Sequence, residues 1–154
     1  MLTIRDLMTR DVLTLAPDCS VREAAEILAT EHYSGAPVTA HGALVGMLSA
    51  TDLLEFIASL PAEPPEVRDR SERGILDAHT IDEAMTCLPL RTMAPRESVA
   101  HAAEVMAREG IHRLPIVEEG KLVGLLSTTD LMRAVAERRL ERHVFVFPKR
   151  TRTS

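Results

Sequence analysis

The sequence predicts a mixed α/β (α+β) protein made of two β-α-β-β-α repeats that pack sheet to sheet with pseudo-twofold symmetry. Three observations lead to this prediction. A shift of 78 residues aligns 24–57 with 102–135 without a gap, and fifteen of those 34 positions are identical. Each copy combines amphipathic helical patterns with two strand-like runs. A unit this small cannot bury its own sheet well, so we expect the two copies to cover each other.

The first copy shows its elements in a readable order. The run TLAP is expected to be a short extended segment that a proline ends. A helix is predicted within 18–32, because Ser20 and Glu23 form the S-x-x-E pattern of a capping box and apolar residues follow at helical spacing. Two strands, at 36–40 and 43–50, are joined by a turn at His41-Gly42. Thr51 is expected to cap a second helix.

The second copy repeats this order, with a turn at Glu119-Gly120. Upstream, the run that begins at Met8 matches the run that begins at Met85, with one extra residue in the second copy. Between the copies lies a segment whose start is rich in proline and charge, which is typical of a linker. The predicted organisation is therefore a first domain at 1–60, a linker at 61–79, a second domain at 80–140 and a basic tail at 141–154.

Composition favours a globular protein without membrane contact. Apolar residues make up 45% of the chain and charged residues 27%. No apolar run approaches the roughly 18–20 residues of a membrane span. The opening MLTIRDLMTRDV carries charges where a signal peptide needs an apolar stretch, so a cytoplasmic protein is expected. Cys19 and Cys87 are then expected to be free thiols, and neither has the spacing of a zinc site.

Charge is distributed unevenly along the chain. Residues 138–154 hold six basic side chains against Glu141 alone, about +5, so the other 137 residues carry about −10. A basic tail could contact nucleic acid or an acidic partner, and the alternative is a solvated tail. The acidic body makes nucleic acid an unlikely main ligand.

The phrase GMLSATDLL at 46–54 returns almost unchanged as GLLSTTDLM at 124–132. In both, hydroxyls and one aspartate stand where a strand is expected to meet a helix. The free N–H groups and the dipole of a helix N-terminus favour an anion, and hydroxyls can bind phosphate oxygens. A carboxylate can accept hydrogen bonds from the two hydroxyls of a ribose, so the set suits a nucleotide. The alternative is that Thr51 and Thr129 are only helix caps, with Asp52 and Asp130 in the favourable first turn.

The repeats resemble CBS domains, named after cystathionine β-synthase, and the chain resembles one tandem CBS pair, or Bateman module. The pattern G-h-h-S-x-T-D at 46–52 and 124–130 carries the resemblance, supported by APV, LPIV and DVLTLAP, over about 120 of the 154 residues. The resemblance implies an adenosyl ligand: AMP, ADP, ATP, S-adenosylmethionine or, in some members, a dinucleotide. It also implies a regulatory module that does no chemistry itself and acts on a partner protein.

Two further stretches resemble ligand-contacting segments of particular CBS proteins. HYSGAPV resembles a segment of chloride-channel CBS domains, which implies that Tyr33 and Ser34 contact adenine. IHRLPIV resembles a segment of the regulatory subunit of AMP-activated kinase, which implies that His112 and Arg113 contact phosphates. The alternatives are that Tyr33 only covers a sheet end and that the His-Arg pair lies on the surface over an acidic neighbour.

In the family, the aspartate of one repeat faces the x-P strand of the other, which implies two unlike clefts. One cleft joins Tyr33, Ser34, Gly35 and Pro37 to Ser127, Thr129 and Asp130. The other joins His112, Arg113 and Pro115 to Ser49, Thr51 and Asp52.

The leading functional hypothesis is a regulatory sensor of an adenine nucleotide that signals to an unknown partner protein. The second is a ligand-free scaffold that only dimerises, and the intact aspartates argue against it. An enzyme is not expected, because no nucleophile–base pair or metal cluster is visible, and neither a cofactor nor a metal is expected. A nucleic-acid role through the tail is a minor fourth hypothesis.

A homodimer is expected because two predicted helices carry apolar faces with too little chain to cover them. These faces hold Leu53, Leu54, Phe56 and Ile57 in the first copy and Leu131, Met132, Ala134 and Val135 in the second. In the tail, the apolar run 144–147 is expected to dock on the body or on a second subunit, with Lys149, Arg150 and Arg152 in solvent.

Overall fold

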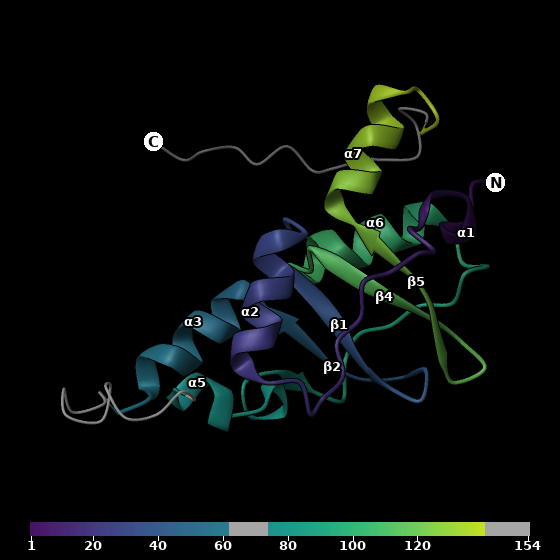
Figure 1. Ribbon diagram of the computed structural model, residues 1–154. Helices are drawn as coiled ribbons and strands as arrows, with labels where there is room; N and C mark the ends of the chain where they lie inside the picture. The colour runs from purple at the N-terminus through teal and green to yellow at the C-terminus, as the bar shows by residue number, and fades with distance from the viewer. Residues whose placement is uncertain (62–73, 141–154) are drawn as a thin grey trace, which may run out of the picture. The chain divides into compact units, whose positions relative to one another are not determined.

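The structure is a computed structural model that describes residues 1–61 and 74–140. It is a mixed α+β structure with antiparallel strands, as predicted (Figure 1). In chain order the elements are α1 (Ile4–Leu7), α2 (Val21–Thr30), β1 (Gly35–Ala40), β2 (Ala43–Ser49), α3 (Ala50–Ser59), α5 (Ile75–Ala78), the 3-10 helix η1 (Ile81–Glu83), β3 (Thr86–Cys87), α6 (Val99–Glu109), β4 (Arg113–Glu118), β5 (Lys121–Ser127) and α7 (Thr128–Ala136).

The chain divides into two compact units whose boundaries differ from those of the sequence repeats. The first-repeat unit contains residues 11–91 and 119–122. The second-repeat unit contains residues 1–10, 92–118 and, within the described part of the chain, 123–140. The first ten residues therefore fold with the second repeat.

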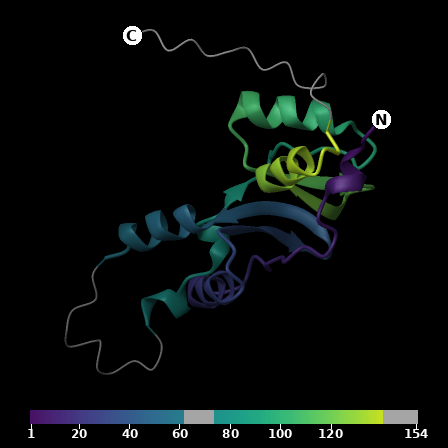
Figure 2. The ribbon, with the colours of Figure 1, turned by 90° about the horizontal axis from the view of Figure 1, so that it is seen from above.

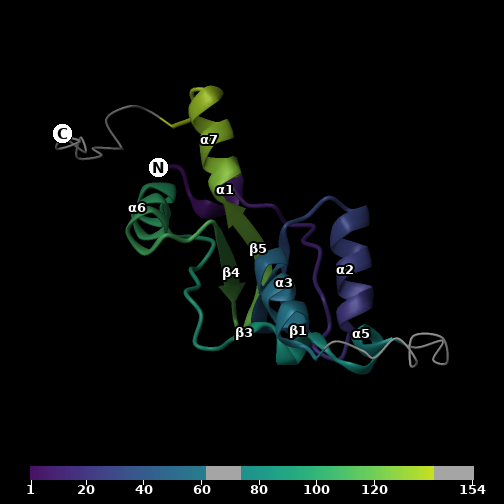
Figure 3. The same ribbon diagram turned by 90° about the vertical axis from the view of Figure 1, so that its left-hand side faces the viewer.

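Helix α2 of the first-repeat unit begins as the sequence predicts. The N–H of Glu23 donates to Oγ of Ser20 at 3.0 Å, and the N–H of Ser20 donates to Oε2 of Glu23 at 3.2 Å, which completes the capping box. Its buried residues, Val21, Ala24 and Leu28, form the face turned to the core. Helix α3 lies next to α2 (Figure 3).

The sheet of this unit has the strand order β1-β2-β3. β1 and β2 are antiparallel and are joined by a tight turn at the predicted His41-Gly42, where both residues have positive φ, 52° and 79°. Two consecutive positive φ values define a type I′ turn, whose twist matches that of a hairpin. The hairpin register places Gly35 opposite Ser49, so the start of β1 adjoins the end of β2.

The second-repeat unit has the same local order, with α6, the antiparallel pair β4-β5, and α7. The turn that joins β4 to β5, at Glu119-Gly120, also has two positive φ values, 50° and 76°. Helix α1 contacts both α6 and α7 (Figure 2). The core of this unit is apolar throughout and consists of Ile4, Met93, Val99, Ala102, Ala103, Val105, Met106, Leu114, Ile116, Leu126, Leu131, Ala134 and Leu140.

Each unit takes its extra pairing segment from the chain that leads into the other repeat. We call residues 1–10 and 80–91 the lead segments. Thr9 and Leu125 exchange two backbone hydrogen bonds, both 2.9 Å long, in the second-repeat unit. In the first-repeat unit, β3 pairs with β2 through Thr86 and Cys87. The lead segments are thus exchanged between the repeats.

The glycine of each repeated phrase is explained by this exchange. A β-carbon on Gly124 would lie 2.5 Å from Sδ of Met8, and one on Gly46 would lie 2.6 Å from Sδ of Met85. Backbone oxygens of the lead segments are also close, at 3.1 Å and 2.9 Å respectively. Real β-carbons do not approach other atoms this closely, so only glycine admits the lead segments in these positions.

The predicted first strand of each repeat is present only as an isolated bridge. Leu15 forms a parallel bridge with Val38, and Met93 forms one with Ile116. The proline two residues after Leu15 and Met93 removes a backbone donor, which is consistent with so short a contact. The sheet-to-sheet packing of the repeats stays a prediction.

The predicted uncovered helix faces are smaller than the sequence analysis proposed. Leu53, Leu131 and Ala134 are buried inside their own units, at 4%, 5% and 1% exposure, so the prediction was wrong for these three. The helical period turns them toward the sheet and moves their neighbours outward. Leu54 and Met132, which are equivalent in the two repeats, are 68% and 60% exposed.

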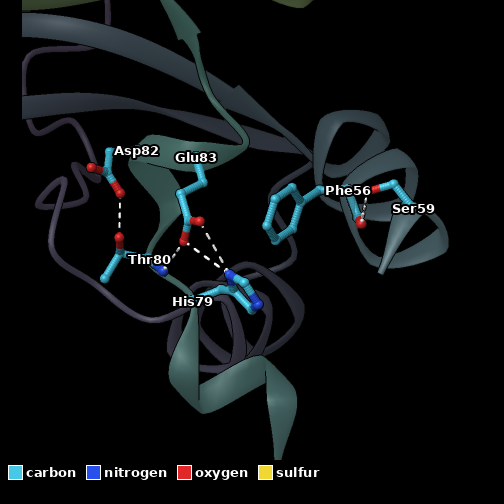
Figure 4. A network of polar contacts seen from close by, with 6 residues as sticks. All are labelled: Phe56, Ser59, His79, Thr80, Asp82 and Glu83. Atoms are coloured by element: carbon cyan, nitrogen blue, oxygen red, sulfur yellow. Dashed lines mark hydrogen bonds and ion pairs between the residues drawn. The ribbon is translucent and has the colours of Figure 1, made fainter. Parts of the chain in front are cut away.

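The body of α3 is held by an aromatic contact with the segment after α5 (Figure 4). The rings of Phe56 and His79 meet edge to face, with centroids 5.4 Å apart. Nδ1 of His79 lies 3.1 Å from both carboxylate oxygens of Glu83, and the N–H of Thr80 donates to the same carboxylate at 3.0 Å. Thr80 also contacts Asp82 through its hydroxyl. The ring contact thus connects α3, the helix that carries the first repeated aspartate, to this segment.

No helix in the part of the chain that the structure describes is long and apolar enough to cross a membrane. The predicted docking of the tail segment 144–147 falls outside the described residues.

Candidate functional site

Ser49 and Asp52 form a reciprocal pair at the junction of β2 and α3. Ser49 is the N-cap of the helix, and its Oγ accepts a hydrogen bond from the N–H of Asp52 at 3.0 Å. Oδ2 of Asp52 accepts the N–H of Ser49, also at 3.0 Å. The helix therefore begins at Ala50, and the prediction that Thr51 caps it was wrong. The cap goes to the serine because Ser49 has the extended backbone that an N-cap needs.

The second repeat builds the same pair from Ser127 and Asp130. Oγ of Ser127 accepts the N–H of Asp130 at 3.1 Å, and Oδ2 of Asp130 accepts the N–H and Oγ–H of Ser127, both at 2.8 Å. Thr129 lies inside the first turn and is not the cap. We call residues 49–52 and 127–130 the S-x-T-D segments. In both of them the aspartate accepts the hydrogen bonds of the helix cap through Oδ2.

The other predicted site residues lie beside the S-x-T-D segment of their own repeat. The carbonyl of Ser34 accepts the N–H of Ala50 at 2.8 Å, and the carbonyl of His112 accepts the N–H of Thr128 at 3.0 Å. Gly35 is buried opposite Ser49 in the hairpin. The residues that resemble adenine and phosphate contacts are therefore adjacent to a helix N-terminus in each unit. Their pairing with the aspartate of the other repeat stays a prediction.

The two prolines of the predicted site are buried. Pro37 and Pro115 lie within β1 and β4, and their carbonyls accept backbone hydrogen bonds from Leu15 and Met93 at 3.0 Å and 3.3 Å. Their rings have no donor to offer, so they shape the strands rather than bind by hydrogen bonds. A contact of either proline with a ligand stays a prediction.

Tyr33 follows a helix end that differs between the repeats. Its side chain is 49% exposed, and its N–H donates to the carbonyl of Leu28 at 3.0 Å. The preceding His32 has φ 57°, the left-handed conformation that Gly110 adopts at the equivalent position with φ 68°. Exposed aromatic rings suit stacking on a base. Because Tyr33 corresponds to Ile111, only the first repeat offers such a ring.

One charged neighbour of the S-x-T-D segments was missed by the sequence analysis. Nη1 of Arg133 lies 3.7 Å from Oδ1 of Asp130, three residues earlier on α7. The corresponding residue of α3 is Glu55. The signal was visible in the spacing, because side chains at i and i+3 of a helix are neighbours.

Within residues 1–61 and 74–140, no three histidine, cysteine or acidic side chains are grouped as a metal site would require. Cys19 and Cys87 are free, as predicted. Burial, aided by the charge of Glu23, raises the pKa of the Cys19 thiol to about 11, so this thiol is a poor nucleophile at neutral pH.

Comparison with known families decides the family of this chain. The model of the CBS domain matches it twice, at residues 4–59 and 81–137. The chain belongs to the CBS domain family. The two matches form a tandem CBS pair, so the resemblance seen in the sequence is confirmed.

Three curated relatives are matched over different shares of their own length. The CBS domain-containing protein YhcV of Bacillus subtilis is 29% identical over 131 residues, which cover 85% of this chain and 84% of YhcV. The uncharacterized protein MJ1232 of Methanocaldococcus jannaschii is 29% identical over 134 residues, 86% of this chain. The CBS pair spans only 39% of MJ1232, and it spans a similar share, 41%, of the uncharacterized protein MJ1225 of the same organism.

A solved CBS pair has the same fold and a bound nucleotide. The crystal structure of CBSX2 in complex with AMP superposes with a TM-score of 0.72 and 27% sequence identity. The match covers 91% of this chain and 100% of CBSX2. A mixed α+β CBS pair is thus the fold of the chain.

Proposed function

We propose that this CBS pair is a regulatory module that binds an adenine nucleotide, AMP, ADP or ATP, or a related adenosyl ligand such as S-adenosylmethionine. Its S-x-T-D segments would hold the ligand, and its output would pass to a separate protein in the cytoplasm. The observation that carries the proposal is the repeated aspartate, whose Oδ2 accepts the hydrogen bond of the helix cap. Its other oxygen, Oδ1, would accept the hydroxyl groups of a ribose. CBSX2, which binds AMP, supports the ligand class.

The local chemistry fits the parts of such a ligand. A ribose offers two adjacent hydroxyl donors, and a carboxylate oxygen at a helix start accepts such donors through charge-assisted hydrogen bonds. Thr51 and Thr129 lie in the first turn, where hydroxyls and free N–H groups suit phosphate oxygens. The exposed ring of Tyr33 would cover adenine, and His112 with Arg113 would contact phosphate. None of these groups forms a nucleophile–base pair, so binding rather than catalysis is the proposed activity.

A thermal-shift panel with AMP, ADP, ATP, S-adenosylmethionine and NAD tests this proposal. A ligand at about 100 times its Kd stabilises the folded state by about 2.7 kcal/mol. For a domain of this size, that corresponds to a rise in Tm of roughly 5–10 °C. A double variant, Asp52→Asn with Asp130→Asn, is the control and should show a smaller shift. If no compound shifts the Tm of the wild-type protein, the ligand-free scaffold is the better function.

The exposed pair Leu54 and Met132 favours a homodimer as part of this function. The two side chains occupy equivalent positions of α3 and α7, and each is more than half exposed. Val135, one turn after Met132, adds a further exposed apolar side chain, at 45%. We propose that these helices meet a second copy of the chain, because large apolar side chains at repeated positions gain free energy when they leave water.

A further inference from the structure

The residues one turn after the two aspartates carry opposite charges. Arg133 follows Asp130 on α7, whereas Glu55 follows Asp52 on α3. Nη1 of Arg133 is 3.7 Å from Oδ1 of Asp130, the oxygen that the helix cap does not use. The side chain of Asp130 is 12% exposed and that of Arg133 is 63% exposed. A mostly exposed cation thus lies 3.7 Å from a mostly buried carboxylate.

The ion pair between Arg133 and Asp130 is close, but it is not a hydrogen bond. At 3.7 Å the two atoms are beyond hydrogen-bond distance, and exposed ion pairs contribute little free energy. A ribose hydroxyl could therefore take Oδ1 without a large loss, and the guanidinium would remain beside the bound sugar. Its positive charge would then attract the phosphate of the same ligand without a direct hydrogen bond.

The repeats differ in where a cation for phosphate is available. The resemblance assigns Arg113 to the site of Asp52, and it leaves the site of Asp130, with Tyr33 and Ser34, without a cation from its strand. The ion pair on α7 offers one from the helix instead. Glu55 offers none, and two acidic side chains three residues apart repel an anion.

We propose that Arg133 is the specificity-determining residue of the second S-x-T-D segment and makes it accept a phosphorylated ligand. This inference rests on the proposed function, because it assumes that the segment binds an adenosyl compound. Arg133 acts on the phosphate alone, so adenosine should not depend on it. The effect should be about three- to tenfold in Kd for AMP, which is the size that Coulomb's law gives for a guanidinium and a phosphate about 7 Å apart in water.

Calorimetric titration of the full chain with AMP and with adenosine tests the inference. The background is Asp52→Ala, so that the second segment supplies the observed binding. Arg133→Gln should weaken the binding of AMP by about three- to tenfold and leave the affinity for adenosine unchanged. Arg133→Lys should keep most of the AMP affinity. The loss should shrink in 0.5 M salt, because salt screens exposed charges. Arg96→Gln is the control for net charge, because Arg96 is 88% exposed and precedes the N-terminus of α6 instead of lying on α7.

The outcomes separate this inference from the proposed function. If Arg133→Gln weakens the binding of AMP and of adenosine equally, or changes neither affinity, the inference is wrong and the proposed function stands. If Asp52→Ala abolishes all binding, the second segment does not bind and the inference again fails alone. If the wild-type chain binds neither compound nor any other member of the thermal-shift panel, both proposals fail together.

Discussion

The side chain of Met8 occupies the space beside Gly124 that a β-carbon would need. A β-carbon there would lie 2.5 Å from Sδ, and the same relation joins Met85 to Gly46 at 2.6 Å. In both cases the methionine belongs to a lead segment and the glycine to the strand that ends at an S-x-T-D segment. The contact therefore connects the exchanged segments to the strands that end at the candidate site.

Gly124→Ala should destabilise the protein by about 1–3 kcal/mol, because the new methyl group forces Met8 out of its position. Met8→Ala in the same chain should recover part of this loss, since the side chain that clashes is then absent. Met85→Ala should recover less of the stability that Gly46→Ala loses, because the backbone oxygen of Thr86 would still lie 2.9 Å from the new β-carbon. Urea unfolding of the single and double variants measures the coupling. Strictly additive losses would show that the contact does not matter.

Gly110→Ala should cost about 1 kcal/mol through backbone strain alone. Gly110 has φ 68°, and no atom lies within 4 Å of the position of its β-carbon. The loss therefore cannot come from a clash. Gly110→Asn should cost less, because asparagine tolerates the left-handed conformation better. Thermal unfolding checks the order, and equal stability of all three proteins would contradict it.

Removing an aspartate of an S-x-T-D segment should affect both binding and stability. Asp130→Ala breaks the capping box and should lower the free energy of unfolding by about 0.5–2 kcal/mol. It should also weaken the binding of a ribose-containing ligand by about 1.5–3 kcal/mol. Ser127→Ala is the matched control, because it removes the cap but keeps the carboxylate. It should lower the Tm to a similar extent with a smaller loss of affinity. Equal losses of affinity in the two variants would contradict a direct role of the carboxylate.

Cys19 should react far more slowly than Cys87 with a thiol reagent at pH 8. Burial, then the charge of Glu23, raises the pKa of Cys19 to about 11 from an ordinary value of 9.0, whereas Cys87 is exposed. A colorimetric thiol assay should show two phases, and Cys87→Ser should remove the fast one. Because the folded state holds this proton more tightly than the unfolded chain does, stability should fall as the pH rises from about 9 toward 11. A single fast phase for both thiols would show that Cys19 is not shielded.

Leu54→Glu together with Met132→Glu should convert the proposed homodimer into a monomer. Both side chains are exposed in the single chain, so the change should leave the fold intact. Light scattering at micromolar concentration gives the mass, and Glu104→Lys on the exposed face of α6 is the control. A monomeric wild-type protein would refute the dimer. A chain that ends at Arg142 tests the docking of the tail, since an unchanged mass and Tm would contradict it.

The sequence by itself determined the local structure of this protein. The capping box of Ser20 and Glu23 and the turns at His41-Gly42 and Glu119-Gly120 lie where their residues predict them. These features depend on backbone conformations and contacts within a few residues, which local sequence encodes. The 78-residue repeat, together with the phrase that it duplicates, was also enough to indicate the family.

Only the tertiary structure decided which segments pair over long distances. Nothing in the sequence of Met8 or Thr9 indicates that this segment packs with the second repeat, because both sheets offer a similar strand ending in the same phrase. The choice between Ser49 and Thr51 as the cap likewise depended on where β2 ends. The contact of Arg133 with Asp130 required the helix to be placed first. These features depend on which surfaces meet after folding, and a repeated sequence presents the same surfaces twice.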